Sequence, residues 1–581
     1  MTSCMKLNRS ILASCMLAVL AAGCTLEPAP QAAPAAAAIV AGQQTTTEEF
    51  YGTTEPFAAE AVYFVLTDRF VNGDPSNDHR NQGGANGTFD RPVEGGPPGR
   101  SANIGYLGGD FKGILDNAAY IRDMGFSALW LTPVVDNPDE AFTGGDEVKW
   151  GGMFQDRGKT GYHGYWGVNF HKLDEHLLSA GLDFAALTEG LEQHGLRTVL
   201  DIVTNHGSPS WTMPVDQPKY GEIYDAEGTL IADHQNLPPG KLDPAGNPLH
   251  GFFHDKPDLV QLSNIDETNP EVMDYFIEAY SKWIDQGADA FRVDTIRHMP
   301  MPFWKEFSAR IRAKRPGFFM FGEAFDHKAE NIAPHTWAEN GSISVLDFPL
   351  KERMAEVFGR KGGGFEQLSE RLYLTDGPYA NPYELMTFYD NHDMARLDAS
   401  DAGFIDANNW LFTARGIPVI YYGSETGFMR GTAEHAGNRN YFGQERVDAA
   451  VGHPIREQLK RIAYVRAASP ALQRGLQLEV LMEGDRAAFY RVLQHAGESQ
   501  IALVLLNKGD AAADFDISDR MQAGTWRAAI AGGDVHVGEG GSLSASVPAH
   551  GVEVYLLDAP VIREDLRTAL ADAMLRTRRA E

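Results

Sequence analysis

The fold class is decided by the stretch Thr198-Val199-Leu200-Asp201-Ile202-Val203-Thr204-Asn205-His206, an apolar, β-branched run that ends in polar side chains. Similar short runs recur along the chain, and helical patterns separate them. Such alternation predicts a parallel sheet wrapped by helices. The predicted strands span residues 61–65, 128–131, 198–203, 290–293, 318–321, 344–346, 385–388 and 419–422. Strands of this number and kind predict an α/β fold with a closed (β/α)8 TIM barrel.

Two further segments interrupt or extend the barrel pattern. Residues 207–265, after the third strand, are longer than one helix requires and rich in Pro, Gly and Asp, which predicts an inserted loop domain, domain B. The barrel is thereby divided into residues 57–206 and 266–468. Apolar runs and turn signals over residues 469–559 predict a C-terminal antiparallel β-sandwich domain, and residues 560–581 a charged terminal helix.

The first residues are typical of an export signal. Lys6 and Arg9 precede an apolar run that is too short for a permanent membrane helix. The run ends at Leu20-Ala21-Ala22-Gly23-Cys24, which resembles the lipobox of bacterial lipoproteins with its leucine one position early. We therefore expect residues 1–24 to be a lipoprotein signal peptide with Cys24 as the anchor; an ordinary signal peptide is the alternative.

The segment after Cys24 completes this expectation. Residues 25–56 are rich in Ala, Pro, Thr and Gln, a composition that predicts a disordered tether. The protein is then exported, as an outer-membrane lipoprotein facing the periplasm or the cell surface, or otherwise as a periplasmic or secreted protein. Contact with a membrane is expected only through the N-terminal lipid anchor.

The charge of the chain limits its partners. A formal net charge of -29 and a sequence pI near 5.0 argue against nucleic acid, because clustered Lys and Arg hold phosphate backbones. A neutral, hydroxyl-rich substrate needs no opposite charge on the protein. We expect a monomer that acts on such a substrate.

Polar clusters follow several of the predicted strands. In a (β/α)8 barrel the C-terminal ends of the strands meet on one face, where chemistry concentrates. Each cluster alone is consistent with a capped or ion-paired strand end, but four of them in barrel order indicate a shared site. The clusters are Asp201–His206, Phe291–Asp294, Phe321–Ala324 and Phe388–Asp393.

These four clusters resemble, in order, the signature regions of the α-amylase family of glycoside hydrolases. The resemblance extends from about residue 61 to residue 559. It is greatest to the branch that contains cyclodextrin glucanotransferases, through Gly164-Tyr165-Trp166, Arg297-His298-Met299-Pro300 and Asn391-His392-Asp393-Met394. The resemblance implies a barrel enzyme that cleaves α-1,4-glucans.

By this resemblance Asp294 is the nucleophile, Glu323 the acid/base and Asp393 a third carboxylate that grips sugar hydroxyls. Retaining hydrolysis needs two carboxyl groups, one ionised and one protonated. Arg292, two residues before Asp294 on the same strand face, favours the ionised nucleophile, and crowding of carboxylates raises the proton affinity of Glu323.

The resemblance also implies a set of substrate contacts. Tyr165 matches an aromatic platform for the sugar, and Phe325 matches an aromatic on the acceptor side. Alignment without gaps places His234 where the glucanotransferases hold a central aromatic residue in the inserted domain. The expected substrate-binding residues are Arg292, His206, His392, Tyr165, His163, Arg297, Phe325 and His234.

Calcium is the expected cofactor, at two sites. The resemblance assigns the first site to an oxygen-rich set of residues, for which a plain Asn/Asp turn is the alternative. Its members are Asn72, Asp74, Asn77, Asp78, Gly108 and Asp110. The second site would use Asn205 and the His298 carbonyl, while the aspartate expected from the inserted domain falls near Leu237.

Three functions compete. The leading one is a retaining, endo-acting α-1,4-glucan hydrolase of the α-amylase type, acting on starch, maltooligosaccharides or cyclodextrins. The second is a cyclodextrin glucanotransferase or another α-glucanotransferase, which passes the glycosyl group to a sugar. The third, a non-catalytic starch-binding lipoprotein, is disfavoured because Asp294, Glu323 and Asp393 are all present. Histidine in the expected central position favours water as the acceptor.

Overall fold

The computed structural model describes residues 48–96, 102–152, 155–433 and 437–576. Parallel strands lie side by side in the order β12-β11-β10-β5-β2-β1-β14-β13. A parallel bridge between Leu346 and Met386 joins the two outer strands, so the sheet closes into a barrel and confirms the predicted fold class. The strands are β1 (Val62–Val65), β2 (Ala128–Leu131), β5 (Arg197–Ile202), β10 (Ala290–Val293), β11 (Phe319–Gly322), β12 (Ser344–Val345), β13 (Met386–Thr387) and β14 (Ile417–Tyr421).

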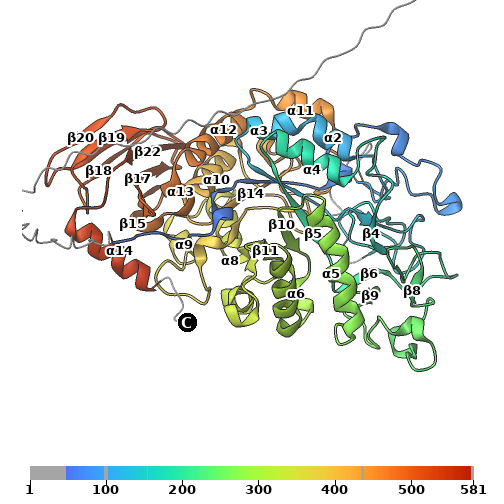
Figure 1. Ribbon diagram of the computed structural model, residues 1–581. Coiled ribbons are helices and arrows are strands. Elements are labelled where there is room, and N and C mark those ends of the chain that lie inside the picture. The colour runs from blue at the N-terminus through green and yellow to red at the C-terminus, as the bar shows by residue number, and fades with distance from the viewer. Residues whose placement is uncertain (1–47, 97–101, 153–154, 434–436, 577–581) are drawn as a thin grey trace, which may run out of the picture. The chain divides into compact units, whose positions relative to one another are not determined.

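Helices cover the outside of these strands (Figure 1). In α5, Asn269 caps the first turn, Pro270 begins the helix, and Val272, Phe276 and Trp283 form a buried stripe. The helices up to the C-terminal domain are α1 (Thr67–Phe70), α2 (Phe111–Asp116), α3 (Ala118–Asp123), α4 (Phe184–Gln193), α5 (Pro270–Asp285), α6 (Met301–Lys314), α7 (Ala329–Ile332), α8 (Phe348–Phe358), α9 (Glu366–Ser369), α10 (Asp401–Thr413), α11 (Gln444–Ala450), α12 (Pro454–Ala467) and α13 (Pro470–Arg474).

The insert after β5 consists of short antiparallel pairs and long loops. β6 (His206–Pro209) pairs with β9 (Leu262–Asn264), and β7 (Glu222–Tyr224) pairs with β8 (Leu230–Asp233). A further pair, β3 (Val135–Asp136) with β4 (Asn169–Leu173), lies in the long connection between β2 and β5. These irregular segments extend from the ends of β2 and β5 that carry the predicted site.

The C-terminal domain is an antiparallel β-structure, as predicted (Figure 1). One sheet has the order β15-β16-β17-β22-β19-β20, and β18 pairs with β21. Phe515 and Leu543 of the smaller sheet share a buried core with Leu503 and Trp526 of the larger one. The elements are β15 (Leu476–Glu483), β16 (Arg486–His495), β17 (Glu498–Asn507), β18 (Ala513–Ile517), β19 (Gly524–Ala528), β20 (Val535–Val537), β21 (Leu543–Val547), β22 (Gly551–Leu557) and the terminal helix α14 (Glu564–Arg576).

The last residues of the predicted tether, residues 48–56, are part of the fold. Phe50 exchanges two main-chain hydrogen bonds with Gln494 of β16, at 2.8 and 2.7 Å, and its ring is buried in the core of the C-terminal domain. The average composition of residues 25–56 gives no sign of the aromatic residue near its end. The predicted signal peptide and Cys24 lie outside the described residues. Within the described ranges, no helix has both the length and the apolarity needed to cross a bilayer.

Candidate active site

The parallel register of three barrel strands brings four charged residues to one end of the barrel. Arg292 of β10 lies opposite Asp201 of β5 and opposite Phe321 of β11. Asp294 follows Arg292 by two residues and therefore lies on the same strand face. Glu323 follows β11 directly, and its main-chain N–H donates to the Val293 carbonyl at 2.8 Å.

The Arg292 guanidinium holds these carboxylates together. Its Nη1 donates to Asp294 Oδ1 at 2.7 Å and to both Asp201 oxygens, at 2.8 and 3.0 Å. Its Nη2 forms an ion pair with Glu323 Oε2 at 3.0 Å. The arginine side chain is fully buried, so these acids supply the partners that a buried cation requires.

Glu323 has the environment of a proton donor. Burial raises the pKa of Glu323 well above its ordinary value; Arg292 opposes this shift, and the charges of Asp393 and Asp294 add to it. Its Oε1 is buried without a hydrogen-bond partner. A carboxyl group in this state remains protonated at a pH at which an ordinary glutamate has lost its proton.

Asp201 is a member of the site to which sequence reasoning assigned no role. It accepts hydrogen bonds from the Tyr165 hydroxyl at 2.8 Å and from Trp130 Nε1 at 3.1 Å, besides those from Arg292. Asp201 therefore fixes both the guanidinium and the predicted aromatic platform. The signal that could have found it is the strand register, which places Asp201 opposite Arg292.

A cleft of about 450 Å³ opens at this end of the barrel. Tyr165 lines it and stacks on His392 with ring centroids 5.4 Å apart. His392 lies behind the wall, and its Nε2 is 3.1 Å from Asp393 Oδ2. Burial lowers the pKa of His392 to about 4, against the charge of Asp393, so the imidazole is neutral. The other predicted residues that line the cleft are Asp294, Glu323, Asp393, His163, His206, Arg297, Phe325 and His298.

Arg439 is a second residue that sequence reasoning missed. Its Nη2 is paired with Asp393 Oδ1, and its Nε donates to the His392 carbonyl at 3.1 Å. It comes from a loop after β14, where no strand-end pattern marks it. The missed residues of the cleft also include Asp156, Lys159, Trp166, Leu259, Val260 and Leu262.

Two predicted residues on the Glu323 side of the cleft contact each other. Arg297 Nη1 donates to the Phe325 carbonyl at 2.7 Å and lies 3.3 Å from the Asp326 carboxylate. Phe325 remains 46% exposed within the cleft. An exposed aromatic ring at this point is available to an apolar sugar face.

The prediction that His234 occupies the cleft is wrong. His234 is fully buried within the insert, stacked on Trp211 at 5.6 Å and close to Phe253 at 5.1 Å, and it does not line the cleft. Burial lowers its pKa to about 4. The insert around His234 consists of turns and an irregular β7–β8 pair, in which counting residues does not fix a position in space.

The family model for the α-amylase catalytic domain matches residues 64–227 and 247–458. The chain belongs to the α-amylase family. It is 28% identical to a cyclomaltodextrin glucanotransferase of Klebsiella oxytoca over 81% of this chain and 73% of the relative. It is also 28% identical to an α-amylase of Niallia circulans, over 85% of this chain and 89% of that protein.

Solved structures with this α-amylase family fold include enzymes of both kinds. The cyclomaltodextrin glucanotransferase CldA, with a three-domain ABC distribution, is 29% identical with a TM-score of 0.70, covering 86% of this chain and 99% of CldA. An Anoxybacillus α-amylase is 26% identical with a TM-score of 0.66, covering 86% and 98% of the two chains.

The first calcium site predicted from the α-amylase family resemblance has side chains that fit a hard cation. The Oδ1 atoms of Asn72 and Asn77 are buried without hydrogen-bond partners. Asn72 Nδ2 donates to Asp78 Oδ1 at 2.7 Å, and Asn77 Nδ2 lies 3.4 Å from Asp110 Oδ2. A Cβ on Gly108 would lie 2.2 Å from Asp78 Oδ1, so only glycine fits there. Orphaned oxygens beside carboxylates are what calcium satisfies.

Asp74 differs from the other members of this set. Its carboxylate caps the following turn by accepting from the Ser76 N–H at 3.0 Å and from the Ser76 hydroxyl at 2.6 Å. Only its main-chain N–H reaches the cluster, where it donates to Asp110 Oδ2 at 2.8 Å. The structure therefore does not place the Asp74 carboxylate with the other oxygens.

An acid of the insert lies beside both residues of the second predicted calcium site. Asp258 Oδ2 lies 3.1 Å from Asn205 Nδ2 and 2.8 Å from His298 Nδ1. Both contacts are made by side-chain nitrogens, whereas calcium binds oxygen ligands. The second calcium site therefore stays a prediction.

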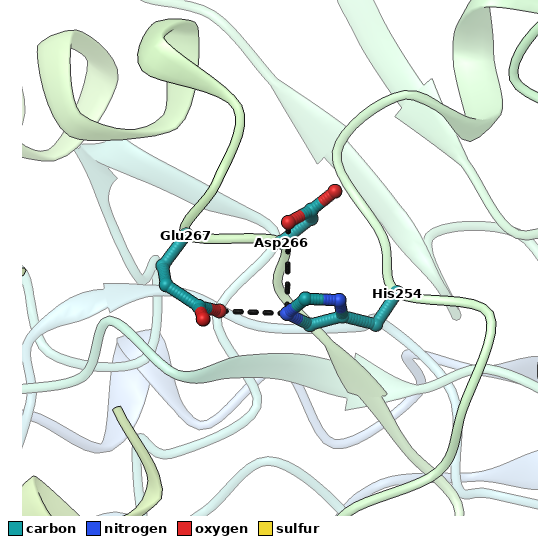
Figure 2. A group of neighbouring side chains, drawn as sticks. All are labelled: His254, Asp266 and Glu267. Atoms are coloured by element: carbon teal, nitrogen blue, oxygen red, sulfur yellow. Dashed lines mark hydrogen bonds and ion pairs between the residues drawn. The ribbon is translucent and has the colours of Figure 1, made fainter. Parts of the chain in front are cut away.

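One other group in the described part of the chain could hold a metal, and sequence reasoning did not find it. His254 Nε2 lies 2.6 Å from Glu267 Oε2 and 3.6 Å from Asp266 Oδ1. Figure 2 shows the imidazole facing both carboxylates. The group is half-buried where the insert returns to α5. Ordinary ion pairing with the imidazole accounts for these contacts.

Proposed function

We propose that the protein is a retaining, endo-acting hydrolase of α-1,4-glucans: starch, maltooligosaccharides or cyclodextrins. One observation carries the proposal: a single buried guanidinium contacts both Asp294 and Glu323, and burial raises the pKa of Glu323 above its ordinary value. Retaining glycoside hydrolysis needs two neighbouring carboxyl groups, one as nucleophile and one as proton donor.

The chemistry follows from these two roles. The Asp294 carboxylate attacks the anomeric carbon while Glu323 gives its proton to the glycosidic oxygen, so that the C–O bond breaks and a covalent glycosyl-enzyme forms. Glu323 then takes a proton from water, whose oxygen attacks the anomeric carbon and releases Asp294. Asp393, fixed by Arg439, accepts hydrogen bonds from hydroxyls of the sugar.

Calcium belongs to the proposal as a structural ion. It would be held by Asn72, Asn77, Asp78, the Gly108 region and Asp110, and at the second site by Asn205, Asp258 and the His298 main chain. A bound hard cation would neutralise these carboxylates and fix the loops that follow β1 and β5.

Water is the proposed acceptor. The reason drawn from the sequence, a histidine at the centre of the cleft, does not hold, because His234 is buried within the insert. A different observation supports hydrolysis: among the described residues, the insert contributes Leu259, Val260 and Leu262 to the cleft and no aromatic side chain. Aliphatic side chains offer a curling glucan chain less of a platform than an aromatic ring.

Transfer to a sugar is the second candidate. It is favoured by the glucanotransferases among the relatives and by the exposed Phe325 ring in the cleft. Incubation with amylose, with chromatography of the early products, separates the two. We expect linear maltooligosaccharides; cyclic glucans as the main early product would establish the transferase instead.

Export of a monomer with a lipid anchor at Cys24 remains part of the proposal. The apolar leader that ends at Cys24 supports export and anchoring. The folded domain begins near Phe50, which pairs with a strand of the C-terminal domain.

A further inference from the structure

The loop that carries Asp393 lies outside any helix or strand. β13 ends at Thr387 and α10 begins at Asp401, so no regular hydrogen-bond ladder serves the main-chain carbonyls between them. Within the loop, the Asp393 N–H donates to Asn391 Oδ1 at 2.9 Å. Buried main-chain carbonyls nearly always have a donor. The position of Asp393 in the cleft therefore depends on donors from elsewhere in the chain.

A single amide holds the loop on both sides of Asp393. Asn438 Nδ2 donates to the Asn391 carbonyl at 2.9 Å, and the same nitrogen donates to the Met394 carbonyl. An amide nitrogen carries two protons, so it can serve two acceptors at once. Asn438 is fully buried, and its Oδ1 finds no hydrogen-bond partner among the described residues. The two donors therefore orient this side chain, and an ionised aspartate could not replace them.

The same amide places Arg439 beside Asp393. Arg439 follows Asn438 in the chain, donates from Nε to the His392 carbonyl at 3.1 Å and pairs through Nη2 with Asp393 Oδ1. Asn438 is held in turn from behind, because its carbonyl accepts from Nε of the buried Arg396 at 3.1 Å. A shift of Asn438 would therefore move the Asp393 carboxylate together with its guanidinium partner.

We propose that Asn438 is a positioning residue, whose amide fixes the loop around Asp393 so that this carboxylate contacts the sugar hydroxyls in the transition state. The inference rests on the proposed function. Asn438 does not line the cleft, so it affects the substrate only through Asp393. Because the sugar ring distorts as the bond breaks, its contact with Asp393 strengthens in the transition state. Removal of the amide should therefore lower kcat and leave KM nearly unchanged.

Two substrates separate this role from that of the proton donor. In maltoheptaose the leaving group is a glucan and in α-maltotriosyl fluoride it is fluoride, but both present a glucose ring to Asp393. Asn438→Leu keeps the branched shape and removes both donors, so kcat should fall about tenfold on both substrates, with KM within about twofold. A loss confined to maltoheptaose, or a rise of KM with unchanged kcat, would refute the proposal.

A smaller side chain tests whether the donors or the packing of Asn438 matter. Asn438→Ser removes volume but keeps one O–H donor, so kcat should fall only about threefold on both substrates. This variant remains informative where the leucine variant does not fold. A greater loss of kcat in Asn438→Ser than in Asn438→Leu would show that volume is what counts and would overturn the proposal.

A double variant tests the route through Asp393. Asp393→Asn/Asn438→Leu should lose no more kcat than Asp393→Asn alone, because both changes act on one contact with the sugar. Additive losses would mean that Asn438 does not act through Asp393.

Asn440→Ala is the matched control. Asn440 is a buried asparagine of the same loop that does not line the cleft, and its Oδ1 accepts only from the neighbouring Tyr441 N–H, at 2.8 Å, among the contacts of the described residues. This variant should keep the kcat of the wild type. A thermal scan accompanies each variant: a lower unfolding temperature with unchanged kcat at 25 °C in Asn438→Leu would mean a purely structural role and refute the proposal. A wild-type enzyme inactive on both substrates would instead disprove the proposed function.

Discussion

The two ends of the barrel both bury arginine side chains but give them different partners. At the catalytic end, burial opposes the charge of Arg292, yet Asp201, Glu323 and Asp294 raise its pKa above the ordinary value. At the opposite end, Arg466 donates to the carbonyls of Ala58, Gly416 and Leu472 at 3.0, 3.0 and 2.6 Å, and burial lowers its pKa to about 9.

Arg491, like Arg466, is buried and donates to main-chain carbonyls. It extends from β16 of the C-terminal domain to the carbonyls of Thr413 and Ala414, at 2.8 and 2.7 Å, just before β14. Burial lowers its pKa to about 10. Among main-chain carbonyls an arginine joins segments of chain, whereas among carboxylates it holds acidic groups together in one site. Activity should therefore depend on one end and stability on the other.

The largest expected effect is the loss of activity at the catalytic end. Asp294→Asn should reduce kcat/KM on amylose by about 10⁴-fold, since the covalent step loses its nucleophile. The fold should survive, because Arg292 keeps Asp201 and Glu323 as partners. Steady-state kinetics with a thermal scan checks both statements. Retention of a few per cent of activity would refute the nucleophile assignment.

The next effect belongs to the opposite end. Arg466→Met should lower the free energy of unfolding by about 3 kcal/mol, because buried carbonyls lose their donors. The kcat of the folded protein should not change. Arg461→Met, at an exposed arginine of the same helix α12, is the control and should change neither. A fall in kcat at 25 °C with unchanged stability would contradict the division between the two ends.

The same division explains what the sequence could predict. The barrel strands were predicted within one or two residues because buried parallel strands are continuous apolar runs. Asp294 and Glu323 were selected because such runs end at them, and their roles were assigned from the resemblance to the α-amylase family. Arg466 and Arg491 could not be found, because main-chain carbonyls have no sequence signature. His234 was misplaced, and Asp258 was not considered, because position within an insert of turns and bulges does not follow from counting.

A smaller effect is expected from calcium removal. A chelator should lower the unfolding temperature by a few degrees, as an ion bound only to the native state contributes about 2.7 kcal/mol at a hundred times its Kd. Asp110→Ala should lower the starting temperature and abolish the response to chelator. Differential scanning calorimetry with elemental analysis measures both. An unchanged scan, with no calcium in the protein, would remove the ion from the proposal.

The smallest effect is a pH dependence that the buried Glu323 imposes. The acid must be protonated for the first step, and burial raises its pKa, so kcat/KM on maltoheptaose should persist above the ordinary pKa of glutamate and fall as the pH rises through the raised value. Fluoride departs with little help from a proton. For α-maltotriosyl fluoride the loss over the same pH range should therefore be smaller by about tenfold, which corresponds to about 1.4 kcal/mol of proton assistance.

Glu323→Gln should remove the alkaline limb for the fluoride altogether while abolishing most activity on maltoheptaose. Identical alkaline limbs for both substrates in the wild type would mean that the group titrating there is not the proton donor.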